Sequence, residues 1–388
     1  MAQRKPTVLF LAAWYPTPNN KSHGIFIRNH AMALSRFCHV IVVYAYSHHQ
    51  ATVFSKTRVN DNFEEWMLAY KKTTTSVTLL STLIKYIDFK KAYRLLAREL
   101  MLAKTDITSI IVNTVYPTAI ALPLFKTQWP VPYSIIEHWT GYLPEDGNYR
   151  GPLMKYYTGK TIAGANNTFC VSQKQIQAMQ EHGLNGHYKL IYNVVDTAVF
   201  KPVGHNSSQK PLLISVSSLD ERQKNITGLL NVIGALQKKG DDFDFVFIGG
   251  TAALAEHYRL RAAKLNLKNV LFAGSKTPAE IAAYMQKAKA FVLFSNYENM
   301  PVVVLEALAC GLPVFSSDTG CLNTIVKPEF GRLVEIGDES ALAENLSALL
   351  RGQLNFNSAE MSAHIHSVAS YGVVGKQLYD HSSALPES

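Results

Sequence analysis

The chain has 388 residues, of which 47% are hydrophobic and 17% charged, a composition typical of globular rather than disordered or fibrous proteins. This length exceeds what one hydrophobic core normally supports, and no uncharged apolar run reaches the roughly 18 residues of a membrane-spanning helix. The net charge of +9 lies in the first half, because residues 1–200 hold 21 Lys and Arg against 11 Asp and Glu, whereas residues 201–388 hold 17 against 18. Such a sign asymmetry bears on binding partners rather than on fold.

The four cysteines have no spacing typical of zinc sites or of disulfide frameworks, and free thiols among apolar neighbours are typical of a reducing compartment. The apolar run at residues 8–13 has the length of a strand and lacks a cleavage pattern. We therefore interpret it as a first buried strand and expect a cytoplasmic protein.

In the first half, short apolar runs alternate with helical patterns. The strands are expected at Val8–Ala12, Val40–Tyr44, Ile110–Asn113, Tyr133–Glu137, Thr168–Val171 and Lys189–Tyr192, and the helices at Ile25–Ser35, Tyr86–Ala103 and Gln173–Glu181. Buried strands that alternate with helices indicate a parallel sheet with right-handed crossovers.

The second half repeats this scheme. Its strands are expected at Leu212–Ser217, Asp244–Ile248, Val270–Ala273, Ala290–Phe294 and Pro313–Ser316, and its helices at Thr227–Lys238, Ala279–Ala288 and Val302–Ala309. The polar stretch Phe200–Lys210 is rich in Pro, Gly, Ser and Asn, as linkers are, and a last helix is expected at Val373–Ser382. The pattern therefore predicts two doubly wound α/β domains, whose ligands bind beyond the carboxyl ends of the strands.

The first candidate site is the segment from Phe294 to Gly311, where a strand leads through a polar loop into a helix. Glu298 lies in the loop, Pro301 is expected at the first helical position, and Glu306 lies on the helix itself. The backbone N–H groups of Asn299, Met300 and Val302 at such a helix start suit a phosphate, and the two carboxylates suit sugar and ribose hydroxyls. The alternative is that Glu298 only neighbours a helix dipole and that Glu306 pairs with a lysine.

The second candidate is the loop from Ser215 to Asn225, in which Ser218, Arg222 and Lys224 follow a strand. A lysine at this place neutralises a diphosphate and stabilises it as a leaving group. The alternative is a solvated lysine in front of a helix cap.

Two further candidates follow strands of the first half. Gly24 precedes a helix and permits close approach of the backbone to a phosphate or sugar, although the loop has no GxGxxG fingerprint. His138 follows a buried strand beside aromatic residues that suit stacking on a sugar. The alternatives are an ordinary turn glycine and a histidine satisfied within the rim of the core.

Together these segments resemble the retaining glycosyltransferases of family 4, over nearly the whole chain. The resemblance rests on the pair Glu298 and Glu306 with seven residues between them, on Asn193–Asp196 with Phe200 and Pro202, and on the closing segment Tyr371–Val374. It implies the GT-B architecture, with two Rossmann-like domains that face each other across a cleft. Two domains are then expected. Residues 1–203 and 369–388 form the domain that binds the acceptor, and residues 210–368 form the domain that binds the nucleotide sugar.

The resemblance also implies the site residues. Glu298, Lys224 and His138 are the expected catalytic residues, and backbone around Gly249, Gly274 and Lys276 is expected to hold the base. The expected donor-binding residues are Gly24, Ser218, Arg222, Lys224, Gly249, Gly274, Lys276, Glu298, Asn299, Met300, Pro301, Val302 and Glu306.

The chain departs from the family pattern at three places. Ser217 and Ser218 stand where the family often has Gly-Arg, which makes Arg222 the candidate replacement for a phosphate-binding cation. Asn299–Pro301 replaces Gly-Phe-Gly after the first glutamate, and His23 replaces a glycine in the N-terminal loop. These departures bear on the identity of the donor.

The implied reaction transfers a sugar, with retention and without a metal or other cofactor, from a nucleotide diphosphate sugar to a glycan or polyprenyl-diphosphate-linked acceptor, as in bacterial surface polysaccharide synthesis. A UDP-sugar is the first expectation for the donor and a GDP-sugar the second. The alternatives left open are a GT-B-type epimerase or phosphorylase and a catalytically silent subunit that binds a nucleotide sugar for a partner transferase.

Residues 71–104 combine eight Lys and Arg with two acidic residues and many apolar and aromatic ones. A helix of this kind is typical of peripheral binding to an anionic membrane surface. The alternative is that the apolar residues face the core and the cations are solvated. Nucleic acid is not expected as a partner, since the sequence has no matching motif.

Overall fold

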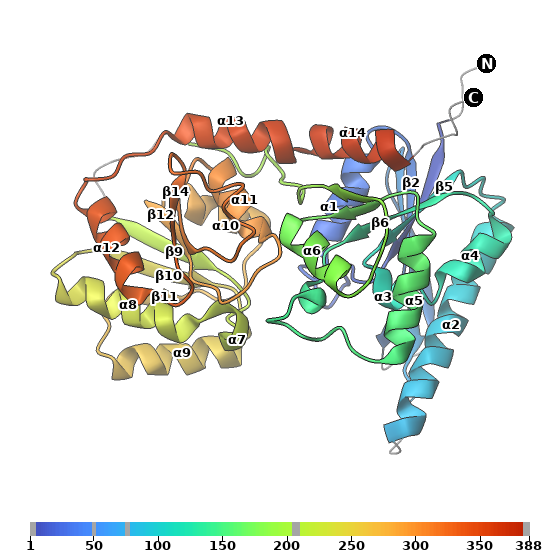
Figure 1. The fold of residues 1–388 in the computed structure, drawn as a ribbon, viewed down its shortest axis with the longest axis horizontal. Helices are drawn as coiled ribbons and strands as arrows, with labels where there is room; N and C mark the ends of the chain where they lie inside the picture. Colours follow the sequence, from blue (N-terminus) through green and yellow to red (C-terminus); the bar gives the residue numbers. More distant parts are fainter. Residues whose placement is uncertain (1–4, 49–51, 74–77, 204–209, 383–388) are drawn as a thin grey trace. The chain divides into compact units, whose positions relative to one another are not determined.

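A computed structural model describes residues 5–48, 52–73, 78–203 and 210–382, and the chain divides into two units (Figure 1). Unit 1 comprises Met1–Val194 with Tyr371–Ser388, and unit 2 comprises Val195–Ser370. Both are α/β units built on predominantly parallel sheets, which confirms the predicted fold class.

The sheet of unit 1 has eight strands in the order β3-β4-β2-β1-β5-β6-β7-β8, and every neighbouring pair except β3 with β4 is parallel. Its central strands are apolar on both faces, as strands covered by helices on both sides must be. The strands are β1 (Thr7–Ala12), β2 (His39–His48), β3 (Val53–Asn60), β4 (Phe63–Lys71), β5 (Ser109–Asn113), β6 (Tyr133–Glu137), β7 (Thr168–Cys170) and β8 (Tyr188–Leu190).

The helices of unit 1 cover this sheet and connect its parallel strands. They are α1 (Ile25–Leu34), α2 (Thr78–Leu102), α3 (Val115–Thr118), α4 (Leu122–Gln128), α5 (Pro152–Ala163), α6 (Gln173–Glu181) and α14 (Tyr371–Ser382), with a 3-10 turn η1 (Thr140–Tyr142). The helix α14 packs on α1 so closely that a Cβ at Gly375 would lie 2.2 Å from the carbonyl oxygen of Ala33. Only glycine fits this contact without a shift of backbone.

The hairpin β3–β4 was not expected from the sequence. Asp61 and Asn62 form its turn, and β3 is antiparallel to β4 at the edge of an otherwise parallel sheet. Every residue of β3 is exposed, so this strand has no alternation of buried and exposed positions that would predict it.

The sheet of unit 2 has six parallel strands in the order β11-β10-β9-β12-β13-β14. They are β9 (Leu212–Val216), β10 (Asp244–Ile248), β11 (Val270–Phe272), β12 (Ala290–Leu293), β13 (Val314–Ser317) and β14 (Gly331–Val334). The helices are α7 (Glu221–Lys224), α8 (Ile226–Lys238), α9 (Ala252–Lys264), α10 (Pro278–Met285), α11 (Val302–Ala309), α12 (Glu339–Leu350) and α13 (Ser358–Ala369). Figure 1 shows α8, α9 and α12 on one face of this sheet and α10, α11 and α13 on the other.

The boundary between the units lies earlier than the predicted linker. The chain enters unit 2 at Val195, whereas the sequence analysis placed the end of the first domain at residue 203. The physical reason is a backbone bridge in which the N–H of Val195 donates to the carbonyl oxygen of Ala369 (2.8 Å), which ties residues 195–203 to unit 2. The chain returns to unit 1 after Ser370, next to the predicted boundary at 369, and part of the predicted linker, residues 204–209, lies outside the described residues.

Candidate functional site

The strand order of unit 2 indicates where a ligand site is expected. Strand β9 is the first strand of the unit and β12 the fourth, and they are neighbours at the point where the winding of the sheet reverses direction. In open parallel sheets the loops at the carboxyl ends of two such strands diverge and leave a crevice for a ligand. Here these are the loop at 217–220, which leads into α7, and the loop at 294–301, which leads into α11.

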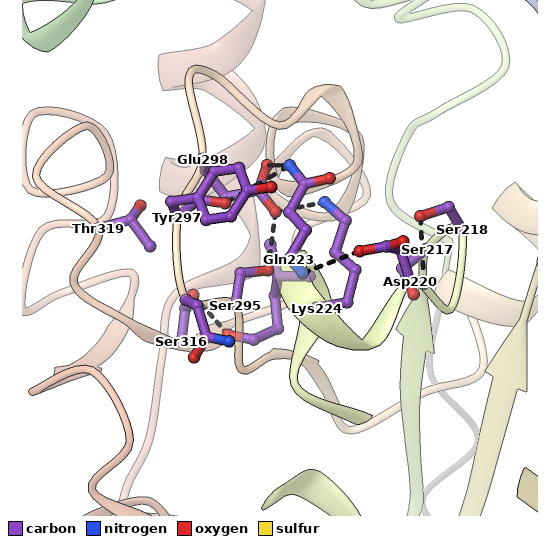
Figure 2. Close-up of polar contacts among 12 residues, drawn as sticks. Ser217, Ser218, Asp220, Gln223, Lys224, Ser295, Tyr297, Glu298, Ser316 and Thr319 are labelled. Atoms are coloured by element: carbon purple, nitrogen blue, oxygen red, sulfur yellow. Dashed lines mark hydrogen bonds and ion pairs between the residues drawn. The ribbon is translucent and has the colours of Figure 1, made fainter. Parts of the chain in front are cut away.

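A buried ion pair joins these two loops. The ammonium of Lys224, at the end of α7, contacts Oε1 of Glu298, and the two side chains are only 12% and 5% exposed. Gln223 Nε2 donates to the second carboxylate oxygen (3.3 Å), and Ser295 Oγ donates to the first (2.7 Å). Figure 2 shows the side chains of Gln223 and Lys224 reaching this carboxylate from α7. Lys224 is therefore not a solvated lysine in front of a cap, which was the alternative reading of the sequence.

Backbone hydrogen bonds hold the loop of Glu298 against α7. The backbone N–H of Asn296 donates to the carbonyl oxygen of Gln223 (2.8 Å). The side-chain amide of Asn296 donates to the carbonyl oxygen of Arg222 (2.9 Å). The Arg222 residue itself is exposed on α7. Gln223 and Ser295 were not singled out in the sequence, where neither has a distinctive spacing, although each neighbours a residue that was.

The helix α11 has the predicted bounds, but Pro301 lies one residue before its first helical position, where the sequence analysis expected this proline. Pro301 has φ −70° and ψ 113°, so it precedes the helix as its cap, and Val302 is the first helical residue. No side-chain cap covers this helix start, and the first intrahelical bond from this end runs from the N–H of Val304 to the carbonyl oxygen of Pro301 (3.1 Å). A helix start without a capping side chain presents backbone donors to an anion.

Glu306 lies on α11 and is chemically distinct from Glu298. The residue is half-buried, and desolvation by the surrounding protein raises the pKa of its carboxyl to about 8. Among the described residues its carboxylate has no hydrogen-bond or ion-pair partner, so the alternative that it pairs with a lysine is wrong. A partly accessible carboxyl without a partner is suited to receive hydrogen bonds from a ligand.

The remaining predicted residues of this unit line the same edge of the sheet. Gly249, after β10, has φ 108°, and a Cβ there would lie 2.1 Å from the carbonyl oxygen of Ser217, so only glycine permits this approach of the two strand ends. Gly274, after β11, has φ 66° and accepts a hydrogen bond from the N–H of Gly249 (2.8 Å). The ammonium of Lys276 lies 3.6 Å from Glu280, and Ser218 is exposed, with its hydroxyl accepting from the N–H of Asp220 (3.4 Å).

Gly24 and His138 belong to unit 1 and lie near each other at the carboxyl edge of its sheet. Gly24 caps α1 with φ 64°, and a Cβ there would lie 2.6 Å from the carbonyl carbon of Trp14. The ring of His138 lies 4.7 Å from that of Phe26 and 5.1 Å from that of His30. Burial and the neighbouring His30 hold the pKa of His138 well below its usual value, so its imidazole is neutral at physiological pH.

Glu137 positions the loop that carries His138, a role that the sequence analysis did not assign. Its fully buried carboxylate accepts hydrogen bonds from the N–H groups of Val115 (2.9 Å), His138 (2.8 Å) and Trp139 (3.0 Å) and from the hydroxyl of Tyr142 (3.1 Å). Burial nevertheless raises the pKa of this carboxyl. The carboxylate thus supports the backbone at His138 through hydrogen bonds within the protein.

The strand order of unit 1 points to two more residues that the sequence analysis missed. Its reversal point lies between β1 and β5, where β5 ends at the buried residue Asn113 and the buried residue Thr114 follows. Among the described residues, the side-chain amide of Asn113 and the hydroxyl of Thr114 have no hydrogen-bond partner, and Thr114 has φ 59°, which is rare for a β-branched residue. The available signal was their position at the end of a predicted strand, with Asn113 as its last residue and Thr114 directly after it.

The described part of the chain contains no group of three or more His, Cys, Asp or Glu side chains that could hold a metal ion. Within the same ranges, no helix combines the length and hydropathy needed to cross a bilayer.

The chain is similar to known glycosyltransferases. Residues 197–365 match the family model described as glycosyl transferases group 1. An uncharacterized glycosyltransferase of Methanocaldococcus jannaschii is 26% identical over 253 residues, which cover 64% of this chain and 68% of that protein. The N,N'-diacetylbacillosaminyl-diphospho-undecaprenol alpha-1,3-N-acetylgalactosaminyltransferase of Campylobacter jejuni is 27% identical over 215 residues, 51% of this chain and 55% of that enzyme.

A solved structure shows the same fold over the full length. The Anabaena protein HepE, crystallised with UDP and glucose, superposes with a TM-score of 0.69 at 14% identity and covers 98% of this chain and 100% of its own. The chain therefore has the two-domain GT-B fold and is similar to glycosyltransferases, and its residues 197–365 match the family model of the group 1 glycosyl transferases.

Proposed function

We propose that this protein transfers a sugar from a nucleotide diphosphate sugar, in first place a UDP-sugar, to a glycan or a polyprenyl-diphosphate-linked acceptor, in the cytoplasm and for surface polysaccharide synthesis. The observation that carries the proposal is the buried pair of Lys224 and Glu298 at the reversal point of the unit 2 sheet, beside the uncapped start of α11. The UDP bound to HepE supports the choice of nucleotide.

The donor's diphosphate is assigned to Lys224 and to the backbone N–H groups at the start of α11. A cation and a helix start both favour a dianionic group, and a site in which both are already in place needs little reorganisation when charge develops. Arg222 is exposed on the same short helix and is the proposed second cation. Glu306 is assigned to the ribose hydroxyls and Glu298 to the transferred sugar.

Retention of the anomeric configuration is part of the proposal. The leaving β-phosphate accepts the proton of the acceptor hydroxyl on the same face of the sugar as the bond that breaks, so that no protein nucleophile is needed. Lys224 and the α11 start stabilise the charge that forms on the diphosphate, and we expect this to suffice without a metal. His138, neutral at physiological pH, can accept or donate one hydrogen bond to a sugar hydroxyl.

The acceptor assignment rests on chemistry and on one relative. The enzyme from Campylobacter jejuni carries in its name a sugar linked through a diphosphate to undecaprenol. An acceptor of that class combines a glycan end, two negative charges and a lipid. The basic excess of the first half of the chain suits such an anionic acceptor.

A donor panel tests the proposal. Thermal unfolding is measured with UDP- and GDP-sugars, and the nucleotide sugar that stabilises the protein is then supplied with a polyprenyl-diphosphate-linked acceptor, with and without EDTA. We expect stabilisation by a UDP-sugar and transfer that survives EDTA. Binding without transfer to any acceptor would favour a silent subunit, and conversion of the donor to an isomer would favour an epimerase.

The raised pKa of Glu306 predicts a pH-dependent affinity for UDP. Ribose hydroxyls that donate to Glu306 favour its carboxylate, whereas in the free protein the carboxyl is largely protonated below a pKa of about 8. We therefore expect the affinity to rise by up to about tenfold per pH unit as the pH approaches 8 and to level off above it. Calorimetric titration over this range measures the slope.

The variant Glu306→Gln supplies the reference for this measurement, because it removes the titrating group while the phosphates of UDP still titrate. The affinity of the variant for UDP should rise less steeply with pH than that of the wild type. Above pH 8 the variant should bind UDP more weakly than the wild type does. Equal slopes for the two proteins would remove Glu306 from the ribose site.

A further inference from the structure

Four large apolar or aromatic side chains are exposed on the first halves of α2 and α5 in unit 1. Leu83 and Ile87 on α2 are 55% and 40% exposed, and Leu153 and Tyr156 on α5 are 46% and 60% exposed. Single exposed apolar side chains are ordinary, whereas several on adjacent helices mark an interaction surface. We name these two helix segments, residues 83–98 and 152–160, the α2–α5 face.

The two helices form one continuous surface. The hydroxyls of Tyr86 on α2 and Tyr157 on α5 are 2.9 Å apart and hydrogen-bonded, so the helices are in contact within their first halves. Each helix starts on the side of the sheet where the strands end, because α2 follows β4 and α5 follows β6 (Figure 1). The start of the α2–α5 face thus lies toward the same sheet edge as His138 and Gly24.

Exposed cations alternate with the apolar side chains on this face. On α2 the residues Ile87, Lys91, Arg94 and Arg98 recur at the three- and four-residue spacing of one side of a helix, and all are exposed. Exposed Lys155 and Lys160 continue the charge on α5, which has no acidic residue. Of the two acidic residues on α2, Asp88 accepts a hydrogen bond from the backbone N–H of Thr73 (3.3 Å), and Glu99 lies near the far end.

The structure also separates core residues from surface residues in the basic segment. Tyr93 and Leu96 of α2 are fully buried, so the sequence-based alternative in which the apolar residues face the core is correct for these positions. The same alternative is wrong for Leu83 and Ile87, whose side chains are exposed. The charge is likewise concentrated in unit 1, whose sequence holds 22 Lys and Arg against 12 Asp and Glu.

We infer that the α2–α5 face docks on an anionic lipid leaflet. Exposed Leu, Ile and Tyr side chains insert at the level of the headgroups, while Lys and Arg extend from the helices to the lipid phosphates. The inference rests on the proposed function in one respect, since a polyprenyl-diphosphate-linked acceptor must be taken from a bilayer. Docking through this face keeps the carboxyl edge of the unit 1 sheet, with His138, close to the leaflet that holds that acceptor.

Co-sedimentation with vesicles tests the inference on the full chain. Vesicles that contain phosphatidylglycerol should retain the protein at low salt and lose it at high salt, and vesicles of phosphatidylcholine alone should bind it weakly. The double variants Leu83→Gln with Ile87→Gln and Arg94→Gln with Arg98→Gln should each lower the partition coefficient roughly tenfold or more. All four positions are exposed, so the fold should be retained.

Matched controls come from exposed residues of unit 2. Leu260→Gln with Leu265→Gln removes two leucines of similar exposure (49% and 44%), and Lys238→Gln with Lys264→Gln removes the same charge as the arginine pair. Neither control should change vesicle binding. Equal losses in face variants and controls, negligible binding to either vesicle, or preferential binding to RNA would each overturn the inference.

Binding of UDP to the same proteins separates this inference from the proposed function. If UDP binds and the vesicles do not, the docking face is wrong and the proposed function stands. If the vesicles bind through the α2–α5 face and neither UDP nor GDP binds, the proposed function is wrong and the docking face stands.

Discussion

Replacement of Lys224 by alanine is expected to lower the turnover number about 100-fold or more at saturating donor, the scale on which loss of one preorganised charge stabiliser slows an enzyme. The side chain is 12% exposed and lies at the reversal point of the unit 2 sheet, where the diphosphate is proposed to bind. A cation in such a partly dry site acts on the leaving diphosphate with little screening by water. Steady-state transfer assays at several donor concentrations measure the effect.

Two comparisons make this result specific to the position of the charge. Lys224→Arg keeps the cation and should recover part of the turnover, whereas Lys264→Ala removes an exposed lysine of α9 and should leave turnover unchanged. Lys224→Ala also leaves the carboxylate of Glu298 without its ion-pair partner, so thermal unfolding must show that the variant is folded at the assay temperature. Near-normal turnover of the folded variant would contradict the assignment.

The second large effect is expected for Glu298→Gln, which should lower transfer about 100-fold while the affinity for UDP changes little. Glu298 lies on the loop before α11, whereas Glu306 lies on the helix itself, and we assign only Glu306 to the nucleotide. The glutamine has nearly the same shape and can still accept from Ser295, so the change mainly removes the charge. Turnover and UDP affinity are measured on the same preparation.

A double-mutant cycle with Lys224 completes this experiment. Because Lys224 and Glu298 form an ion pair in the free protein, the effects of the two substitutions on the free energy of unfolding should be strongly non-additive. If Lys224 and Glu298 act on the same departing diphosphate and sugar, the fold-loss of turnover in the double variant should also be smaller than the product of the fold-losses in the two single variants. A Glu298→Gln variant that loses UDP affinity and keeps its turnover would exchange the proposed roles of the two glutamates.

The sequence by itself determined the fold class and the places of the main candidate residues. The alternation of buried strands with helices has a local cause, the two periodicities of side-chain direction, and it predicted α11 at Val302–Ala309 as the structure has it. Because residues that follow parallel strands gather at one sheet edge, Lys224 and Glu298 could be assigned to one edge although 74 positions separate them.

Only the tertiary structure decided which of these residues make contact and in what state. The strand order places β9 beside β12, and this neighbourhood, which depends on pairing far along the chain, brings Gln223 and Ser295 to the carboxylate of Glu298. Within the described part of the chain it also leaves Glu306 half-buried and without a hydrogen-bond or ion-pair partner, and desolvation raises the pKa of its carboxyl to about 8. The burial and the hydrogen bonds of a side chain depend on all the residues that surround it in space, and a single sequence does not show which residues these are.

The same reason explains the elements that the sequence analysis missed. The strand β3 is exposed at every position and is held by its pairing with β4, so no burial pattern marks it. The unit boundary at Val195 is set by a bridge to Ala369, far away in the chain, rather than by the polar composition of residues 200–210. Local patterns predict elements whose side chains are sorted by burial, whereas elements and boundaries defined by pairing between distant segments are fixed only when the chain is folded.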